Sequence, residues 1–381
     1  MTRSRLAVPH AGRSPKKEMT TPMKTLEEQI DERVGEVRTD TFDISFGEIV
    51  NLHQNKELII QPEYQRLFRW SSNQKSQLIE SILLELPVPQ IFVIENQDGV
   101  FELIDGLQRI SSVIQFLDPA VLDYDPLIMS GCSLIPALND KVFSDLPLSL
   151  RLRIKRSPIR MVVIKKQSRG FLRYEMFKRL NTGGSNLEPQ EIRNCSARMV
   201  GEQGVDFYSF LVEMANVQAF RECAAYLPSP DLDKKGDEEL VLRFFALKNS
   251  EESFRGSVRD WLDGYMESVL LSKDPFPYEE ERKVFTRVFS AARAKLGETA
   301  FVRYRNNEPI GSLAPAYFEA VSMAIANTIE QTEIKDGESL REAVTAAIQS
   351  EDFRSVTGPG ANSKDKLRRR IEIVAQALQA V

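Results

Sequence analysis

The chain has 381 residues, of which 42% are hydrophobic and 28% are charged, and its formal net charge is −5. This length is enough for two or three domains with real cores, and the composition is ordinary for a soluble globular protein. No apolar run is long enough for a membrane span, and no secretory signal opens the chain. The three cysteines lack metal-ligand spacing, and two histidines, His10 and His53, are too few for a histidine-based metal site. We therefore expect a cytoplasmic protein with reduced thiols.

Positive charge is concentrated at the N-terminus. Residues 1–24 contain six Lys or Arg and one Glu, a local charge of +5, which leaves −10 for the remainder. This leader contains Pro and Ser and has no apolar periodicity, so it is expected to be a disordered basic tail. It could contact nucleic acid, or it could be sequence upstream of a true start at Met19 or Met23.

Short strand and helix patterns alternate in the next part of the chain. Helical patterns occur at residues 25–37, 46–53, 72–86, 106–117, 169–180 and 188–195, and strand-length apolar runs at 41–45, 58–60, 91–94, 101–104 and 159–165. The turn at 96–99 predicts a hairpin, whereas residues 118–158 are rich in Pro and Asp and are expected to form an irregular surface excursion. These elements predict a small mixed sheet with helices, an α+β fold.

Beyond residue 200 the apolar spacing is helical almost throughout. Apolar stripes of this kind usually form a core rather than contacts to a cofactor. We place one boundary near residue 200, between an α+β domain at 25–200 and an all-helical domain at 201–381.

The stretch from Val100 to Leu117, VFELIDGLQRISSVIQFL, changes from strand to helix period at Asp105-Gly106. Asp105 is expected to be the N-cap, with Gln108 completing a capping box. Arg109 then lies in the first helical turn, beside exposed backbone N–H groups. Such a helix start can bind an anion, and phosphate is the expected one. The alternative is an ordinary capped helix after a strand.

Three other clusters could take part in chemistry. Arg66 and Arg69 could clamp phosphates while Tyr64 or Trp70 stacks on a base, although the same stretch could be a solvated loop. Glu80 could bind a divalent metal or water, or it could be a solvated helix residue. The stretch at 181–184, beginning with Asn181, could nest an anion or simply end a helix.

No lysine-containing phosphate loop, zinc spacing or kinase signature is present. Phosphate recognition is therefore the only chemistry that composition and spacing suggest. Two basic stretches, 151–160 and 364–370, could grip phosphates or could be solvated helix surface.

Four blocks, PEYQRLFRW, LIESILLELPVPQIFV, LIDGLQRISSVIQF and FKRLNTGGSNLEPQEIRN, occur in this order. Together they resemble the N-terminal family of GmrSD-type restriction enzymes, also catalogued as domain of unknown function 262. The resemblance implies a ParB/sulfiredoxin-like core, and DEELVLRFFAL looks like the family's usual helical continuation. It also implies a nucleotide-phosphate site at the DGxxR turn, with NTP hydrolysis or NTP-controlled DNA cleavage as the activity.

The resemblance carries over to individual residues of this chain. Leu107 stands where the family most often has Gln, so either this side chain faces the core or one substrate contact is missing. Many relatives append a His-Asn-His nuclease domain, and with only two histidines this chain is not expected to contain one. The motif residues are Tyr64, Gln65, Arg66, Asp105, Gly106, Gln108, Arg109 and Asn181.

Two functions remain open at this point. In the first, the protein is an NTPase of a restriction or phage-defence system that acts on DNA. Asp105, Arg109 and Glu80 are then catalytic, and Asp105 holds Mg²⁺ or orients water. In the second, it is a non-catalytic, nucleotide-gated module that regulates an effector protein. The nucleotide, the partner and the oligomeric state are left open by the sequence.

The first prediction concerns the basic leader. Deletion of residues 1–22 should leave the melting temperature and nucleotide binding unchanged, because the segment has no apolar face to contribute to a core. Thermal melting and nucleotide titration of the truncated and full-length chains test this. A fall of many degrees would mean that the leader is a docked segment.

Overall fold

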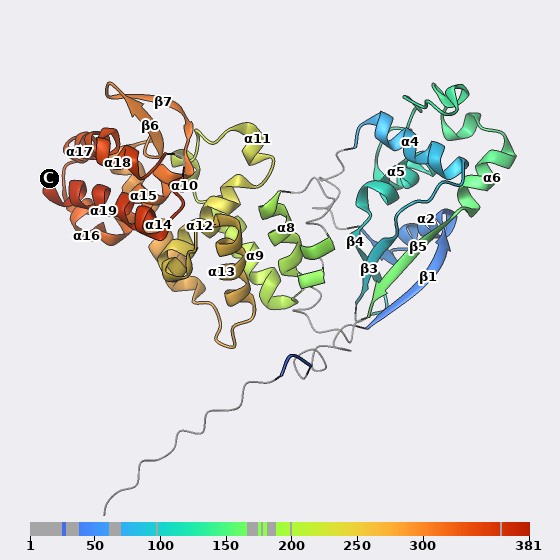
Figure 1. The fold of residues 1–381 in the computed structure, drawn as a ribbon, viewed down its shortest axis with the longest axis horizontal. Helices are drawn as coiled ribbons and strands as arrows, with labels where there is room; N and C mark the ends of the chain where they lie inside the picture. The colour runs from blue at the N-terminus through green and yellow to red at the C-terminus, as the bar shows by residue number, and fades with distance from the viewer. Residues whose placement is uncertain are drawn as a thin grey trace, which may run out of the picture.

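The computed structural model describes residues 25–27, 38–60, 70–96, 98–165, 174–176, 178–180, 188–198, 200–358 and 360–381. Over these ranges a five-stranded mixed sheet with helices is followed by a largely helical part (Figure 1). The predicted fold class is therefore confirmed. Across the same ranges, no helix combines the length and apolar character needed to cross a bilayer. The domain boundary at residue 200 stays a prediction.

The sheet has the order β1-β5-β3-β4-β2. β3 and β4 pair antiparallel, so the predicted hairpin is present, and its turn is held by the Asn96 side chain, which accepts bonds from the N–H groups of Asp98 and Val100. β3 runs parallel to β5, and β1 is antiparallel to β5 at the outer edge. The strands are β1 Thr39–Ser45, β2 Leu58–Ile59, β3 Ile91–Glu95, β4 Phe101–Asp105 and β5 Pro158–Ile164.

Four helices accompany the sheet: α2 (Phe46–Gln54), α4 (Ser72–Leu83), α5 (Leu107–Leu117) and α6 (Leu148–Arg156). Ser71 caps α4, and Gln74 three residues later completes a capping box. Ile79, Ile110 and Ile154 are fully buried in the same core as the central strands.

The expectation that residues 118–158 are irregular is wrong in part. The stretch contains α6, whose Ile154 enters the core, and three short 3₁₀ turns. These turns are Pro119–Leu122, Pro136–Leu138 and Phe143–Asp145.

The second half is built around a cluster of phenylalanines that contact one another in tilted and edge-to-face geometry. The rings of Phe285 and Phe289 lie 4.4 Å apart, and Phe220 and Phe244 approach the same pair. The helices are α9 Glu202–Ala215, α10 Gln218–Cys223, α11 Ser229–Leu232, α12 Gly236–Ser250, the 3₁₀ turn Glu251–Ser253, α13 Val258–Leu270, α14 Tyr278–Leu296, α15 Pro315–Asn327, α16 Ile329–Ile334, α17 Gly337–Gln349, α18 Glu351–Ser355 and α19 Lys364–Ala380.

A two-stranded hairpin of β6 (Val302–Arg305) and β7 (Glu308–Leu313) interrupts these helices and was not predicted. Its turn residues, Asn306 and Asn307, have positive φ values of 52° and 63°. Asparagine tolerates this conformation, which suits a two-residue hairpin turn.

Helix α8 (Pro189–Arg198) joins the two halves. Every residue from Gln190 to Ala197 is buried. Ile192 and Cys195 belong to the hydrophobic cluster of the sheet, whereas the polar side chains of α8 bond to the helical part. α8 is thus buried between the sheet and the helical part, because its apolar residues pack on one and its polar residues bond to the other.

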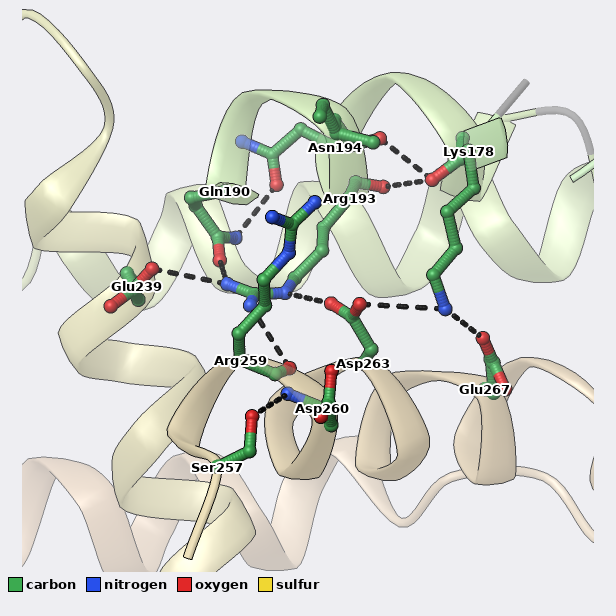
Figure 2. Close-up of polar contacts among 12 residues, drawn as sticks. Lys178, Gln190, Arg193, Asn194, Glu239, Ser257, Arg259, Asp260, Asp263 and Glu267 are labelled. Atoms are coloured by element: carbon green, nitrogen blue, oxygen red, sulfur yellow. Dashed lines mark hydrogen bonds and ion pairs between the residues drawn. The ribbon is translucent and has the colours of Figure 1, made fainter. Parts of the chain in front are cut away.

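Arg193 is the centre of the polar contacts of α8 (Figure 2). Only 2% exposed, it donates from Nε to Asp263 at 2.6 Å and from Nη1 to Glu239 at 3.1 Å. Lys178 approaches the other oxygen of Asp263 at 3.4 Å and bonds Glu267 at 2.8 Å. Burial acts to lower the pKa of Lys178, but its bond to Glu267 and the charge of Asp263 produce a net increase.

The ion pairs continue from Glu239 through the helical part. Glu239 bonds Arg243 at 2.9 Å, Arg243 bonds Glu319 at 2.8 Å, and Glu319 also accepts a bond from Arg370 of α19. Burial acts to raise the pKa of Glu239, but the charges of Arg243 and Arg193 give a net decrease. Alternating charges therefore link α8 to the last helix.

Arg193→Met should destabilise the protein by about 3–5 kcal/mol, because Asp263 and Glu239 lose the buried guanidinium that both contact and keep only Lys178 and Arg243 as counter-charges. Arg282→Met is the matched control. Arg282 pairs with Glu213 at the surface, and the loss should be about 1 kcal/mol or less. Urea unfolding of both variants measures the difference. Equal losses would show that the buried network is energetically no different from a surface pair.

Candidate functional site

The turn at the end of β4 places the start of α5. β4 extends through Asp105, and Gly106 is the N-cap, with φ 102° and no side-chain cap. The predicted cap by Asp105, and with it the capping box with Gln108, is wrong. Pairing of Asp105 with Phe92 of β3 keeps Asp105 in the sheet, so the chain leaves the strand one residue later than expected.

Gly106 is required for two reasons. Its positive φ disfavours any residue with a side chain. A Cβ atom built at this position would also lie 2.5 Å from Cγ2 of Ile91 and 3.0 Å from its Cβ. The turn therefore rests directly on the first residue of β3.

Arg109 holds the turn together. Its Nη2 donates to Asp105 Oδ2 and to the backbone carbonyl of Gln90, both at 2.9 Å. The side chains of Asp105 and Arg109 are 28% and 17% exposed. The Arg109 Nε is buried and has no partner within the described ranges. Arg109 thus links α5 to the end of β4 and to the residue before β3, with part of its guanidinium left uncommitted.

The contacts of Leu107 and Gln108, the two residues after Gly106, show how this part of the motif is oriented. Leu107 packs against the core of the sheet, so its side chain faces inward, and the turn lacks that polar side chain. The Gln108 amide oxygen accepts a bond from the Trp70 backbone N–H at 3.1 Å. Trp70, four residues after the predicted Tyr64-Gln65-Arg66 block, is therefore adjacent to the turn. Those three residues and Asn181 lie outside the described residues.

Glu80 is not a solvated helix residue, which was one of the two alternatives that the sequence left open. It is 3% exposed, and its Oε1 accepts bonds from the N–H groups of Leu134 at 2.9 Å and Ile135 at 2.6 Å. Burial, followed by the charge of Glu80, raises the pKa of the nearby Cys132 thiol. No bond within the described part of the chain joins Glu80 to Asp105 or Arg109. Its observed contacts hold the loop that follows α5.

The structure also bears on metal and DNA contacts. In the described segments, no group of three His, Cys, Asp or Glu side chains is arranged to hold a metal ion. A nucleotide-bound Mg²⁺ needs only one or two protein carboxylates, so a single Asp would be sufficient. In the basic stretch at 364–370, four cations pair with carboxylates: Lys364, Arg368, Arg369 and Arg370.

Some residues of the site carried no signal in the sequence. The Gln90 carbonyl and the Ile91 side chain meet the turn only because β3 lies beside β4. The apolar run at 91–94 predicted a strand there. That this strand lies beside the turn depends on the order of the strands in the sheet, which the sequence did not specify.

The fold and the turn define a small α+β domain in which a strand, a glycine and a helix form a candidate anion site. Residues 46–197 match the family model described as GmrSD restriction endonuclease, N-terminal domain. This part of the chain is similar to that domain family, and the match runs from the start of α2 into α8. No curated protein and no solved structure matches the chain.

Comparison of Gly106→Ala with Gly99→Ala separates the two requirements at Gly106, which are its positive φ and its close contact with Ile91. Both glycines have positive φ, but a Cβ at Gly99 would meet nothing within 4 Å. We expect Gly99→Ala to cost about 1–2 kcal/mol for the backbone alone, and Gly106→Ala about 2–4 kcal/mol because Ile91 must also move. Denaturant unfolding measures the free energy of unfolding of both variants. Equal decreases would mean that the Ile91 side chain moves aside at no energetic cost.

Proposed function

We propose that this protein is a nucleotide-binding, NTP-hydrolysing component of a restriction or phage-defence system that acts on DNA or is regulated by it. The observation that carries the proposal is the uncapped start of α5 beside the Asp105–Arg109 pair. It lies inside the segment that matches a restriction endonuclease domain. The function rests on this turn and not on general DNA affinity, because the chain is acidic outside its leader.

The turn offers the groups that a phosphate needs. The first backbone bond at the start of α5 runs from the Ile110 N–H to the Gly106 carbonyl at 2.9 Å. The N–H groups before Ile110 therefore have no acceptor within the helix and point out of its positive end. With the Arg109 guanidinium beside them, they form a suitable environment for phosphate oxygens.

Asp105 has a role in the hydrolytic form of the proposal. Its Oδ2 is occupied by Arg109, while Oδ1 has no bond within the described chain. Oδ1 could therefore hold a nucleotide-bound Mg²⁺ or orient the attacking water. Mg²⁺ would supply charge neutralisation between the phosphate oxygens. Tyr64, Gln65, Arg66 and Asn181, which the resemblance implies, would complete the contacts to the nucleotide.

The second candidate is a nucleotide-gated module without catalysis, and the side-chain bonds favour it in one respect. Glu80, a predicted catalytic residue, is committed to two backbone N–H groups, and Arg109 is partly committed to Asp105. Phosphate release from each NTP, with and without DNA, separates the two candidates. Binding without release would support the module.

Arg109→Ala tests the phosphate site itself. Loss of a charge-assisted contact should weaken NTP binding about ten- to hundredfold. Arg109→Lys should restore binding only in part, because an ammonium lacks the planar fork of a guanidinium. Titration of labelled NTP against the wild type and both variants gives the dissociation constants.

Melting curves must accompany these titrations, because Arg109 also bonds Asp105 and Gln90. The Ala variant should melt lower, so affinity is measured well below its transition. Arg153→Ala, which removes an exposed pair with Glu85 in the same half of the chain, is the control. If a folded Arg109→Ala protein binds NTP as tightly as the control, Arg109 has only a structural role.

A further inference from the structure

β1 is an open edge of the sheet. Its only paired neighbour among the described residues is β5, and it lies at the end of the strand order and along the outer side of the sheet (blue, Figure 1). The five residues from Thr39 to Asp43 are all exposed. A seven-residue edge strand with five exposed residues is a template for pairing with another strand.

The register shows which backbone groups are open. Lys165 N–H bonds the Arg38 carbonyl at 2.8 Å, and Phe46 N–H bonds the Ser157 carbonyl at 3.1 Å. Bonded pairs alternate along an antiparallel ladder, so Asp40, Phe42 and Ile44 direct their backbone groups toward β5. The N–H and C=O groups of Thr39, Thr41 and Asp43 point away from β5. Within the described chain these outward groups have no partner.

The usual protection against edge pairing is weak on this strand. β1 contains neither Pro nor Lys, and its two carboxylates are already neutralised by β5 and the residue after it. Asp43 bonds Arg160 at 2.9 Å, which lowers the pKa of Asp43, and Asp40 bonds Lys165 at 2.8 Å. Phe42, at the middle of the strand, is 42% exposed.

We propose that β1 is a homodimer interface, in which the β1 strands of two copies pair antiparallel about a two-fold axis at Thr41. Thr41 then lies opposite the second copy's Thr41, and Thr39 opposite the second copy's Asp43. The three residues with outward backbone groups thereby form the bonded pairs, and two sheets become one. This surface is independent of the nucleotide turn.

A second copy fits this edge because β1 is complementary to itself in this register. Two threonines face each other at the centre, which is a favourable cross-strand pair, and a threonine hydroxyl faces a carboxylate at each end, so that no like charges lie directly opposite each other. An axis at Asp43 would instead place two carboxylates opposite each other, which is unfavourable. A closed two-fold pairing also leaves no further edge of β1 for additional copies.

Cysteine crosslinking of the full-length chain tests the register. In a bonded antiparallel pair the Cα atoms are about 5.5 Å apart, which is within disulfide reach, so Thr41→Cys should form a covalent dimer on oxidation. Thr39→Cys is the matched control. Its two copies would be offset by four residues, about 13 Å along the strand, and should not crosslink. The native cysteines, Cys132, Cys195 and Cys223, are buried.

Sedimentation velocity over a range of concentrations tests the interface without a crosslink. The wild type should show a concentration-dependent dimer. Thr41→Pro removes the central outward N–H without breaking a bond to β5, and should shift the protein to monomer at an unchanged melting temperature. Thr41→Val keeps the N–H and should keep the dimer. A monomeric wild type, a dimer that survives Thr41→Pro, or equal crosslinking of both cysteine variants would overturn the proposal.

Discussion

The position of the candidate site depends on the contact between Gly106 and Ile91. Because β3 and β4 are neighbours in the sheet, the chain that leaves β4 passes over the first residue of β3, where only a glycine fits. The same neighbourhood brings the Gln90 carbonyl within reach of Arg109. The start of α5 is therefore fixed by the sheet before any ligand binds, and little ordering of the backbone remains for binding.

The Asp105–Arg109 pair places two opposing demands on this turn. It holds the guanidinium in place, but it also sets a carboxylate beside the proposed path of a polyphosphate. The carboxylate of Asp105 and the phosphates would repel each other, and this repulsion is strong because Asp105 is partly buried. A divalent cation bound to the nucleotide would offset this repulsion, and the carboxylate of Asp105 is the group that would hold it. Within the proposed function, the charge arrangement therefore favours a metal-chelated nucleotide over a free one.

Features that depend on residues close together in the sequence were predicted, whereas features that depend on contacts between distant residues were not. The hairpin at 96–99, β5 and α8 were predicted, because local patterns specify them. The N-cap of α5 was placed one residue too early, because a strand pairing with Phe92 decides where β4 ends. The burial of Glu80 could not be predicted, because the N–H groups that it binds lie more than fifty residues further along the chain.

Two secondary-structure elements were missed for a different reason. α6 follows a stretch rich in Pro and Asp, and its basic side chains conceal the single buried position at Ile154. The β6–β7 hairpin has a turn of two asparagines, a weaker signal than Asn-Gly, and lies between strongly helical segments. Composition around an element can thus outweigh the element's own pattern when only the sequence is considered.

The contacts of α8 bear on how a nucleotide could affect the helical part. Lys178 and Glu188 precede and follow the predicted contact residue Asn181 in the sequence, and both are held by the helical part. Lys178 bonds Asp263 and Glu267 of α13, and Glu188 bonds Lys234, which precedes α12, at 2.7 Å. From Arg193 the alternating charges then reach α19. If Asn181 contacts the nucleotide, as the resemblance implies, any displacement there acts first on α13 through the half-buried pairs of Lys178, and on the chain just before α12 through the exposed Glu188–Lys234 pair.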